Sequence, residues 1–310
     1  IALHGMEAAL GVKHDQRGWL DKSPYAVVRY ADDFVVLCDS QASAQTAKAI
    51  LQDWLQPRGL TLSPEKTHIV HLRQGFDFLG CHIRHYPAPK TTRTGWKLLI
   101  TPSQQAITKV RAKLKHLWQQ LRGYPVRVVI RALNPLIRGW ANYYRPYVSS
   151  AVFRRLDRWM YIRQWRYLRR QHPSQSRRWC YRHYWGKFDP QHPQSLCFGD
   201  RTSGVPLLKF SQFSIQRHVL VRGTASMDDP TLKAYWQHRQ TKPINQLTPS
   251  RQRIVRQQAG RCPVCGDSLF NGELLDLHHR LPRANGGQDV YSNLEVLHLY
   301  CHYQRHAQLP

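Results

Sequence analysis

The feature that most constrains the fold is a short acidic tip, Tyr30-Ala31-Asp32-Asp33, between two apolar runs. Residues 25–28 precede the tip and residues 34–37 follow it, and both runs are rich in valine and aromatic side chains. Two such runs joined by a short turn predict a β-hairpin. Adjacent carboxylates repel each other, and divalent metal ions offset that repulsion. Because paired Mg²⁺ ions activate a 3′-hydroxyl in nucleotidyl transfer, Asp32 and Asp33 are candidate Mg²⁺ ligands.

The charge of the chain indicates a polyanionic partner. Lys and Arg total 46 against 19 Asp and Glu, which gives a net charge of +27. Such an excess repels itself unless a polyanion is present, and nucleic acid is the expected one. A membrane surface is the alternative, but no apolar run approaches the ~20 residues needed to span a bilayer. Residues 101–190 hold 20 Lys and Arg but two acids, so this block carries +18 of the net charge.

The basic block predicts three helices. Apolar residues recur at spacings of three and four between positions 107 and 121, which is typical of an amphipathic helix. Thr101 is the expected N-cap of this helix, and Pro102 suits its first helical position. Further helices are expected over residues 126–136 and 152–168.

Arginines and aromatic residues alternate along this block, which suits RNA because phosphates need cations and unstacked bases need flat partners. The alternative is a solvated helical face, and most of the individual aromatic side chains are expected in the core in either case. We predict that the basic side chains of these helices bind nucleic acid. They are Lys109, Arg111, Lys113, Lys115, Arg138, Arg154, Arg155, Arg158, Arg163 and Arg166.

Two cysteine-containing pairs near the C-terminus predict a metal site. Cys262 and Cys265 form a Cys-x2-Cys pair, and His298 and Cys301 form a His-x2-Cys pair further on. Four soft ligands in two close pairs fit a tetrahedral structural Zn²⁺ site. The alternative is free buried cysteines beside an unrelated histidine. This grouping of cysteines also argues against a disulfide framework and indicates a reducing compartment.

A second histidine pattern lies around these pairs. His278-His279 precedes the glycine pair 286–287 and Asn293, and His302 follows Cys301 directly. Residues 258–310 thereby resemble the His-Asn-His (HNH) nuclease family, whose fold is two strands and a helix around one catalytic metal. The resemblance implies that His279 is the general base that activates water and that Asn293 holds the loop of His279 in place.

The same resemblance makes His278 and His302 candidate ligands of a catalytic divalent ion. His306 shares a helical face with His302, so it is a further candidate ligand or a phosphate contact. His279 follows His278 directly and is expected on the opposite face of the strand. Asp276 shares the face of His278 and is the alternative ligand.

Motifs spread over the chain indicate one larger family. They are the acidic hairpin, Leu62-Ser63-Pro64-Glu65-Lys66-Thr67, Gly75 to Gly80, Arg138-Gly139-Trp140-Ala141-Asn142-Tyr143-Tyr144 and the HNH tail. The chain resembles the C-terminal portion of a group II intron-encoded protein with reverse transcriptase, maturase and HNH endonuclease parts. The resemblance implies an α+β multidomain fold. Its expected parts are a partial palm over 1–87, a basic helical thumb and maturase domain over 101–187, a DNA-binding linker region over 188–250 and a zinc-containing ββα-metal HNH domain over 251–310.

The family resemblance implies a protein that binds intron RNA to assist splicing and nicks target DNA through its HNH site. In this family the palm needs a further carboxylate, which lies well upstream of the acidic hairpin. The given sequence starts at Ile1, after the position of that carboxylate. We therefore expect no polymerase activity from these 310 residues alone, and a missing N-terminal reverse transcriptase portion as a partner. The expected cofactors are structural Zn²⁺ and Mg²⁺ or another divalent ion.

The expected macromolecular partners are group II intron RNA and target DNA, with no membrane. The expected location is the bacterial cytoplasm, in a nucleoid-associated ribonucleoprotein. Two alternatives remain open at this point. One is a stand-alone metal-dependent HNH DNA endonuclease, and the other is a non-catalytic RNA-splicing factor.

Overall fold

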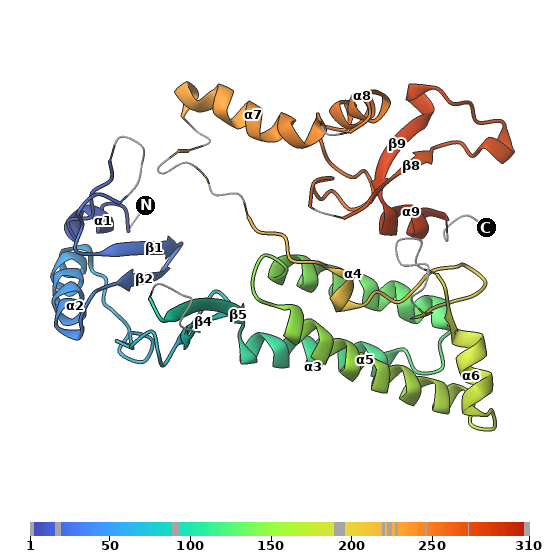
Figure 1. Cartoon of the computed structure of the whole chain (residues 1–310), viewed down its shortest axis with the longest axis horizontal. Helices are drawn as coiled ribbons and strands as arrows, with labels where there is room; N and C mark the ends of the chain where they lie inside the picture. Colours follow the sequence, from blue (N-terminus) through green and yellow to red (C-terminus); the bar gives the residue numbers. More distant parts are fainter. Residues whose placement is uncertain are drawn as a thin grey trace. The chain divides into compact units, whose positions relative to one another are not determined.

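The computed structural model divides the chain into two compact units, each of which is described by itself (Figure 1). Unit 1 comprises residues 1–76, 83–98 and 219–234, and unit 2 comprises residues 77–82, 99–218 and 235–310. The structure describes residues 3–15, 20–88, 94–188, 196–218, 221, 225–226, 229–245, 247–271 and 273–306. The segment expected to be a DNA-binding linker, 188–250, therefore lies partly outside the described residues. The domain boundaries drawn from the sequence stay predictions.

Unit 1 contains the expected acidic hairpin. Strands β1 (Ala26–Tyr30) and β2 (Asp33–Leu37) are antiparallel, and Tyr30 pairs with Asp33 across the tip. Ala31 adopts a positive φ of 55°, which lets two residues reverse the chain. Helices α1 (Met6–Ala9) and α2 (Gln41–Leu55) also belong to this unit. Its core consists of Met6, Leu10, Tyr25, Ala47 and Leu51.

A three-stranded sheet follows in the order β3-β4-β5. The strands are β3 (Phe76–Phe78), β4 (Cys81–Pro87) and β5 (Trp96–Pro102). The last strand corrects one expectation. Thr101 and Pro102 end β5, and Ser103 is the N-cap of the next helix because its hydroxyl accepts a hydrogen bond from the Ala106 amide at 3.2 Å. Serine at this position satisfies one of the free amides of the first helical turn.

The helical part of unit 2 is built from α3 (Gln104–Gln120), α4 (Val126–Tyr144) and α5 (Ser150–Gln171), followed by the shorter α6 (Arg177–Tyr184). Their apolar faces meet in one large core, in which Leu114, Ile130 and Leu168 are fully buried. The second helix passes through Pro135 and continues eight residues beyond the end expected from the sequence. That extension carries Arg138 and Asn142.

The C-terminal part of unit 2 has the expected two strands and a helix. Strands β8 (Leu275–His279) and β9 (Leu294–His298) are antiparallel, and α9 (Leu299–His306) follows directly. Helix α8 (Pro249–Gln257) packs against β9 through a core that includes Ile254, Val255 and Val296. The remaining elements are strands β6 (Trp185–Gly186) and β7 (Cys197–Phe198) and helix α7 (Lys233–Ile244). The chain is thus a mixed α/β protein.

Candidate functional site

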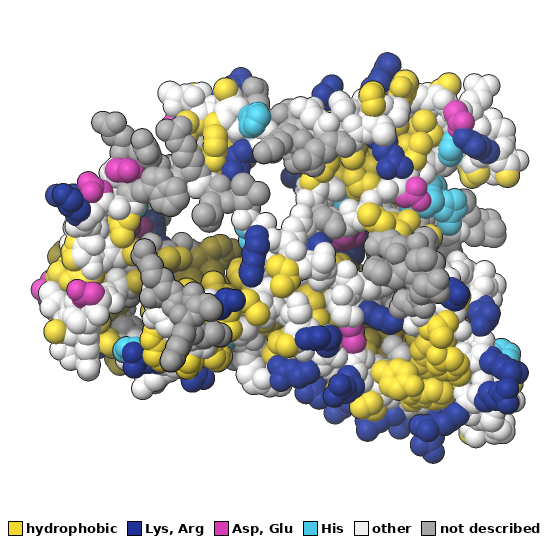
Figure 2. Space-filling view, in the orientation of Figure 1, with side chains coloured by type: hydrophobic (Ala, Val, Ile, Leu, Met, Phe, Trp, Pro, Cys, Tyr) yellow, Lys and Arg dark blue, Asp and Glu magenta, His cyan; other side chains and the backbone are white. Residues whose placement is uncertain are grey.

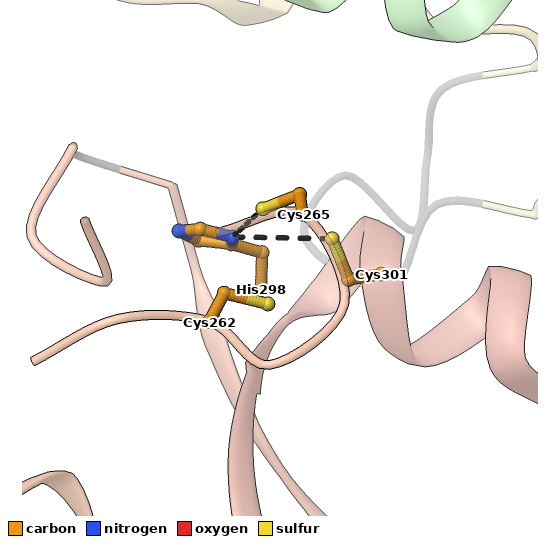
Figure 3. Close-up of side chains that lie close together, drawn as sticks. All are labelled: Cys262, Cys265, His298 and Cys301. Carbon is orange, nitrogen blue, oxygen red and sulfur yellow. Dashed lines mark hydrogen bonds between the residues drawn. The ribbon is translucent and has the colours of Figure 1, made fainter. Parts of the chain in front are cut away.

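The two cysteine-containing pairs meet in one cluster (Figure 3). Cys262 and Cys265 lie in the turn after α8, whereas His298 ends β9 and Cys301 lies in the first turn of α9. Their ligand atoms all lie within 4.8 Å of one another. The Nδ1 atom of His298 is 3.4 Å from Cys265 Sγ and 3.9 Å from Cys301 Sγ. Ligand atoms around a tetrahedral zinc ion are separated by about 3.5–3.8 Å, given the usual Zn–S and Zn–N bond lengths.

The surroundings of this cluster also fit a metal ion. The Nε2 atom of His298 is 3.0 Å from the carbonyl of Ser268, which can accept its hydrogen, so that the lone pair of the ring is on Nδ1, the atom nearest the cysteine sulfurs. The thiol of Cys301 donates a hydrogen bond toward Cys262, and this lowers the pKa of Cys262 well below its ordinary value. A thiolate is the form that binds metal. The cluster could therefore hold a metal ion such as zinc.

A second cluster joins three histidines. His278 comes from β8, and His302 and His306 come from successive turns of α9. Their ring nitrogens lie within 4.8 Å of one another, and the Nε2 atoms of His302 and His306 are 3.0 Å apart. The Nδ1 atom of His278 is buried and makes no hydrogen bond in the described part of the chain. A buried acceptor without a partner among two other imidazoles is the arrangement expected of a metal site.

The electrostatics of this cluster keep His278 neutral. Burial, with the neighbouring His302 and His306, lowers the pKa of His278 to about 4. Burial also lowers the pKa of His302. Neutral imidazole is the metal-binding form of histidine, so neither ring needs to lose a proton near pH 7. Asp276 is not a member of this compact group, but its carboxylate lies 3.1 Å from His302 Nδ1 without forming a hydrogen bond.

His279 belongs to a separate set of contacts. Its side chain is more exposed than that of the adjacent His278, and its Nε2 atom is 2.5 Å from the carboxylate of Asp289. Arg283 pairs with both oxygens of the same carboxylate. Hydrogen bonds from His279 and Arg283 lower the pKa of Asp289, so the carboxylate is charged. Sequence reasoning missed Asp289 and Arg283, although both fall within ten residues of His279.

Asn293 joins the two ends of the loop that connects β8 to β9. Its Oδ1 accepts a hydrogen bond from the Leu281 amide at 2.8 Å. Its Nδ2 donates to the carbonyls of Leu281 at 3.1 Å and Gln288 at 2.9 Å. A Cβ atom on Gly287 would lie 1.9 Å from the Leu281 carbonyl oxygen, so only glycine fits this close approach. Asn293 thus links the two ends of the loop. Its role in holding the loop of His279 in place stays a prediction.

Arg138 departs from its predicted role at a nucleic-acid surface. Its side chain is 8% exposed, and its Nε donates to Glu273 at 2.6 Å. The amide of Asn142 donates to the same carboxylate oxygen at 2.7 Å. Burial alone would lower the pKa of Arg138, but the charge of Glu273 outweighs burial and raises the pKa above its ordinary value. Arg138 is therefore a buried cation that solvent and a flat nucleic-acid surface do not reach.

The other nine predicted nucleic-acid contacts lie on α3 and α5, at or near the surface. Figure 2 shows Lys and Arg gathered over α3, α5 and α6, with hydrophobic side chains among them. Arg111 and Arg163 both contact the ring of Trp159, at 5.3 and 4.9 Å from its centroid. Exposed Tyr161 and Tyr181 border a stack of Trp165 on Trp185. No helix among the described residues has the length and apolar character that a bilayer span needs.

The acidic pair is exposed at the hairpin tip. Asp32 lies in the turn and Asp33 begins β2. Within the described ranges, neither residue belongs to a group of three or more metal-ligating side chains. The structure therefore places the two carboxylates where the sequence predicts them and leaves their metal-binding role a prediction.

Comparison with known families assigns the parts of the chain. A reverse transcriptase (RNA-dependent DNA polymerase) model matches residues 13–83, a group II intron maturase-specific domain matches residues 107–185, and an HNH endonuclease model matches residues 262–308. The chain thus contains a reverse transcriptase domain, a group II intron maturase-specific domain and an HNH endonuclease domain. The acidic hairpin lies in the reverse transcriptase match, the basic helices lie in the maturase match, and both metal clusters lie in the HNH match.

One curated protein is also similar to this intron-type chain. It is an uncharacterized 91 kDa protein in the cob intron of Schizosaccharomyces pombe, 32% identical over 133 residues. The aligned stretch covers 38% of this chain and 16% of that protein. The chain thus spans about a sixth of the length of this relative. The three family models together match most of the chain's own length.

Proposed function

We propose that the HNH domain is a metal-dependent DNA endonuclease in which His279 takes a proton from the attacking water. The contact between His279 Nε2 and the Asp289 carboxylate carries this proposal, with its 2.5 Å separation. A charged carboxylate accepts a hydrogen bond from Nε2–H, which leaves the lone pair on Nδ1 to take the proton. Asn293 bonds to Leu281 at the start of the β8–β9 loop and to Gln288 near its end, next to Asp289. It thereby keeps the loop that carries Asp289 closed.

His278, His302 and His306 are the residues that would hold the catalytic ion. A divalent ion such as Mg²⁺ would there neutralise the phosphate charge and the leaving oxygen. Adjacent residues of one strand supply the metal ligand and the base, so the two functions lie a single residue apart but face opposite ways. Zn²⁺ in the Cys262–Cys265–His298–Cys301 cluster is proposed as a structural ion, because all four ligand positions come from the protein.

We also propose that the basic helices bind the RNA of a group II intron. The charge over α3, α5 and α6 and the exposed Tyr161 and Tyr181 on α5 and α6 support this partner. Such a protein would assist splicing in the reducing cytoplasm of a bacterium and carry the intron to target DNA. Polymerisation at Asp32 and Asp33 would require a further carboxylate, supplied by an additional reverse transcriptase portion.

The nuclease proposal is tested by His279→Ala in the full chain. We expect nicking of a supercoiled plasmid with Mg²⁺ to fall by about 10²- to 10⁴-fold, the usual contribution of a general base. His68→Ala is the matched control, because His68 is an exposed histidine of unit 1 and lies outside the HNH match. Unchanged nicking in His279→Ala would leave the alternative of a splicing factor without nuclease activity.

The RNA proposal is tested by neutralising exposed charge on α5. We expect the triple change Arg154→Gln, Arg158→Gln and Arg166→Gln to weaken binding to a group II intron RNA and to reduce the salt dependence of binding. Loss of about three phosphate contacts would lower the slope of log K against log salt by roughly 2 to 3. A matched triple change at exposed lysines of unit 1, Lys13, Lys66 and Lys97, is the control. An unchanged slope would place the RNA elsewhere.

A further inference from the structure

One face of the maturase helix α4 is directed at the cysteine–histidine cluster of the HNH domain. Three polar residues on that face, Arg138, Asn142 and Arg145, follow at spacings of four and three and therefore share one side of the helix. Asn142 donates to Glu273, and Arg145 Nη1 donates to the carbonyl of Asn271 at 3.1 Å. All of these contacts lie within unit 2. The helix of one domain family thus contacts the residues next to the metal ligands of another.

Arg138 contacts the cluster itself. Its Nη1 donates to Cys301 Sγ at 3.2 Å, and its Nη2 lies 3.6 Å from Cys265 Sγ and 2.9 Å from His298 Nδ1. Its Nε is occupied by Glu273. The planar guanidinium can serve Glu273 and the two cysteine sulfurs at once because its five N–H groups are arranged in a fixed fork. The Nδ1 atom of His298 has one lone pair, which accepts either an N–H of Arg138 or a metal ion. Three of the four candidate metal ligands therefore touch a single side chain of α4.

The positive charge of Arg138 is better balanced when the cysteine–histidine cluster holds a metal ion than when it does not. A buried cation is costly unless anions surround it. Glu273 supplies one negative charge. Three thiolates and one neutral imidazole around Zn²⁺ carry a net charge of −1, and thiolate sulfurs accept hydrogen bonds from N–H donors. Neutral thiols would supply neither the charge nor strong acceptors, so the position of Arg138 is suited to the metal-bound form.

We propose that Arg138 is an outer-sphere partner of the zinc centre, and that zinc binding fastens the HNH domain to maturase helix α4. This inference rests on the proposed zinc site. In this arrangement the metal centre is built from two domains, because four ligands come from the HNH domain and their charge partner comes from the maturase domain. Loss of zinc would then loosen the face of α4 as well as the cysteine turns, and loss of Arg138 would weaken zinc binding.

The first arm of the test measures zinc in the full chain. We expect Arg138→Met to lower zinc affinity by about 10- to 100-fold in competition with a chromophoric chelator, the usual effect of removing an outer-sphere partner. Arg131→Met is the matched control in the same helix, because among the described residues no hydrogen bond joins the Arg131 side chain to the cluster, whereas Arg138 makes several. Glu273→Gln is a milder second variant that keeps the packing and removes the anion. Because the loaded cluster must then balance the charge of Arg138 without Glu273, we expect zinc affinity to rise rather than fall, and a fall equal to that of Arg138→Met would contradict the charge argument.

The second arm uses the wild-type chain, so it does not depend on a variant that folds. Hydrogen exchange is measured with zinc bound and after zinc removal. We expect residues 137–144 of α4 to lose protection together with residues 262–265. Loss of protection confined to residues 259–306, or equal zinc affinity in Arg138→Met and Arg131→Met, would overturn the coupling while leaving the zinc site intact. A purified chain that binds no zinc would overturn the zinc site and the coupling together.

Discussion

The closure of the β8–β9 loop by Asn293 gives a prediction whose magnitude follows from three hydrogen bonds. The Asn293→Ala change removes the bonds to the Leu281 amide, the Leu281 carbonyl and the Gln288 carbonyl. A typical intramolecular hydrogen bond contributes about 0.5–1.5 kcal/mol net, and water can partly replace these bonds because the loop is exposed. The expected loss is therefore about 1.5–3 kcal/mol in the free energy that holds the loop closed.

The loop carries Asp289, so opening it removes the carboxylate from His279. A loss of about 1.4 kcal/mol corresponds to a factor of ten, and we expect the rate of plasmid nicking in Asn293→Ala to fall about 10- to 100-fold. Zinc content should not change, because Asn293 does not contact the cysteine–histidine cluster in the described part of the chain.

The assay is single-turnover nicking of a supercoiled plasmid with Mg²⁺, with zinc measured on the same samples. Asn285→Ala is the matched control, because Asn285 is an exposed asparagine of the same loop. A nicking rate of Asn293→Ala equal to that of Asn285→Ala would refute the reasoning, because the loop would then be held by other contacts. A large loss of zinc in Asn293→Ala would also refute it, since the effect would not be local.

Two further predictions concern the histidines of β8. Asp289→Asn should lower the rate of nicking about tenfold or more, because a neutral amide no longer fixes the hydrogen on His279 Nε2. The control is Asp53→Asn, which changes an exposed aspartate of unit 1. Equal nicking rates in the two variants would show that Asp289 does not act at the site. The pKa of His278 is lowered to about 4 in the folded chain, whereas an unfolded histidine has a pKa of about 6.5. As the pH falls, the unfolded chain therefore protonates His278 before the folded chain does. The stabilising contribution is present above pH 6.5 and is lost as the pH falls toward 4, by at most about 3 kcal/mol. The protection factors of the β8 amides in metal-free protein, which correct for the slower intrinsic exchange at low pH, should fall over that range. The fall should be smaller in His278→Gln, and an identical pH dependence in both proteins would contradict the assignment.

The sequence predicts the parts of these sites that depend on local spacing. Asp32 and Asp33 are neighbours at a hairpin tip, and the Cys-x2-Cys and His-x2-Cys pairs bring ligands together within one turn each. Alternation along a strand likewise predicts that His278 and His279 have different surroundings. Each of these inferences needs a few consecutive residues and no knowledge of tertiary packing.

The parts that the sequence did not predict depend on distant packing. Arg138 looks like one more basic residue of a positively charged helix, and its partner Glu273 lies 135 positions away. Only tertiary contact reveals that this arginine is buried. Asp289 lies ten residues from His279, beyond a glycine pair, so its approach depends on the conformation of the loop. Thr101 and Ser103 are both good N-cap residues, and pairing of the preceding segment as β5 decides between them.

The pairing of β8 with β9 makes the HNH site sensitive to insertion and deletion in a way that substitution does not reveal. His278 pairs with Glu295 and His279 pairs with Leu294. A shift of one residue would exchange the two faces of the strand, so each histidine would turn to the face opposite its present one. The candidate ligand His278 would leave the histidine cluster, and the candidate base His279 would turn away from Asp289. One inserted residue in β8 would therefore disable two chemical functions while every functional side chain remained in the protein.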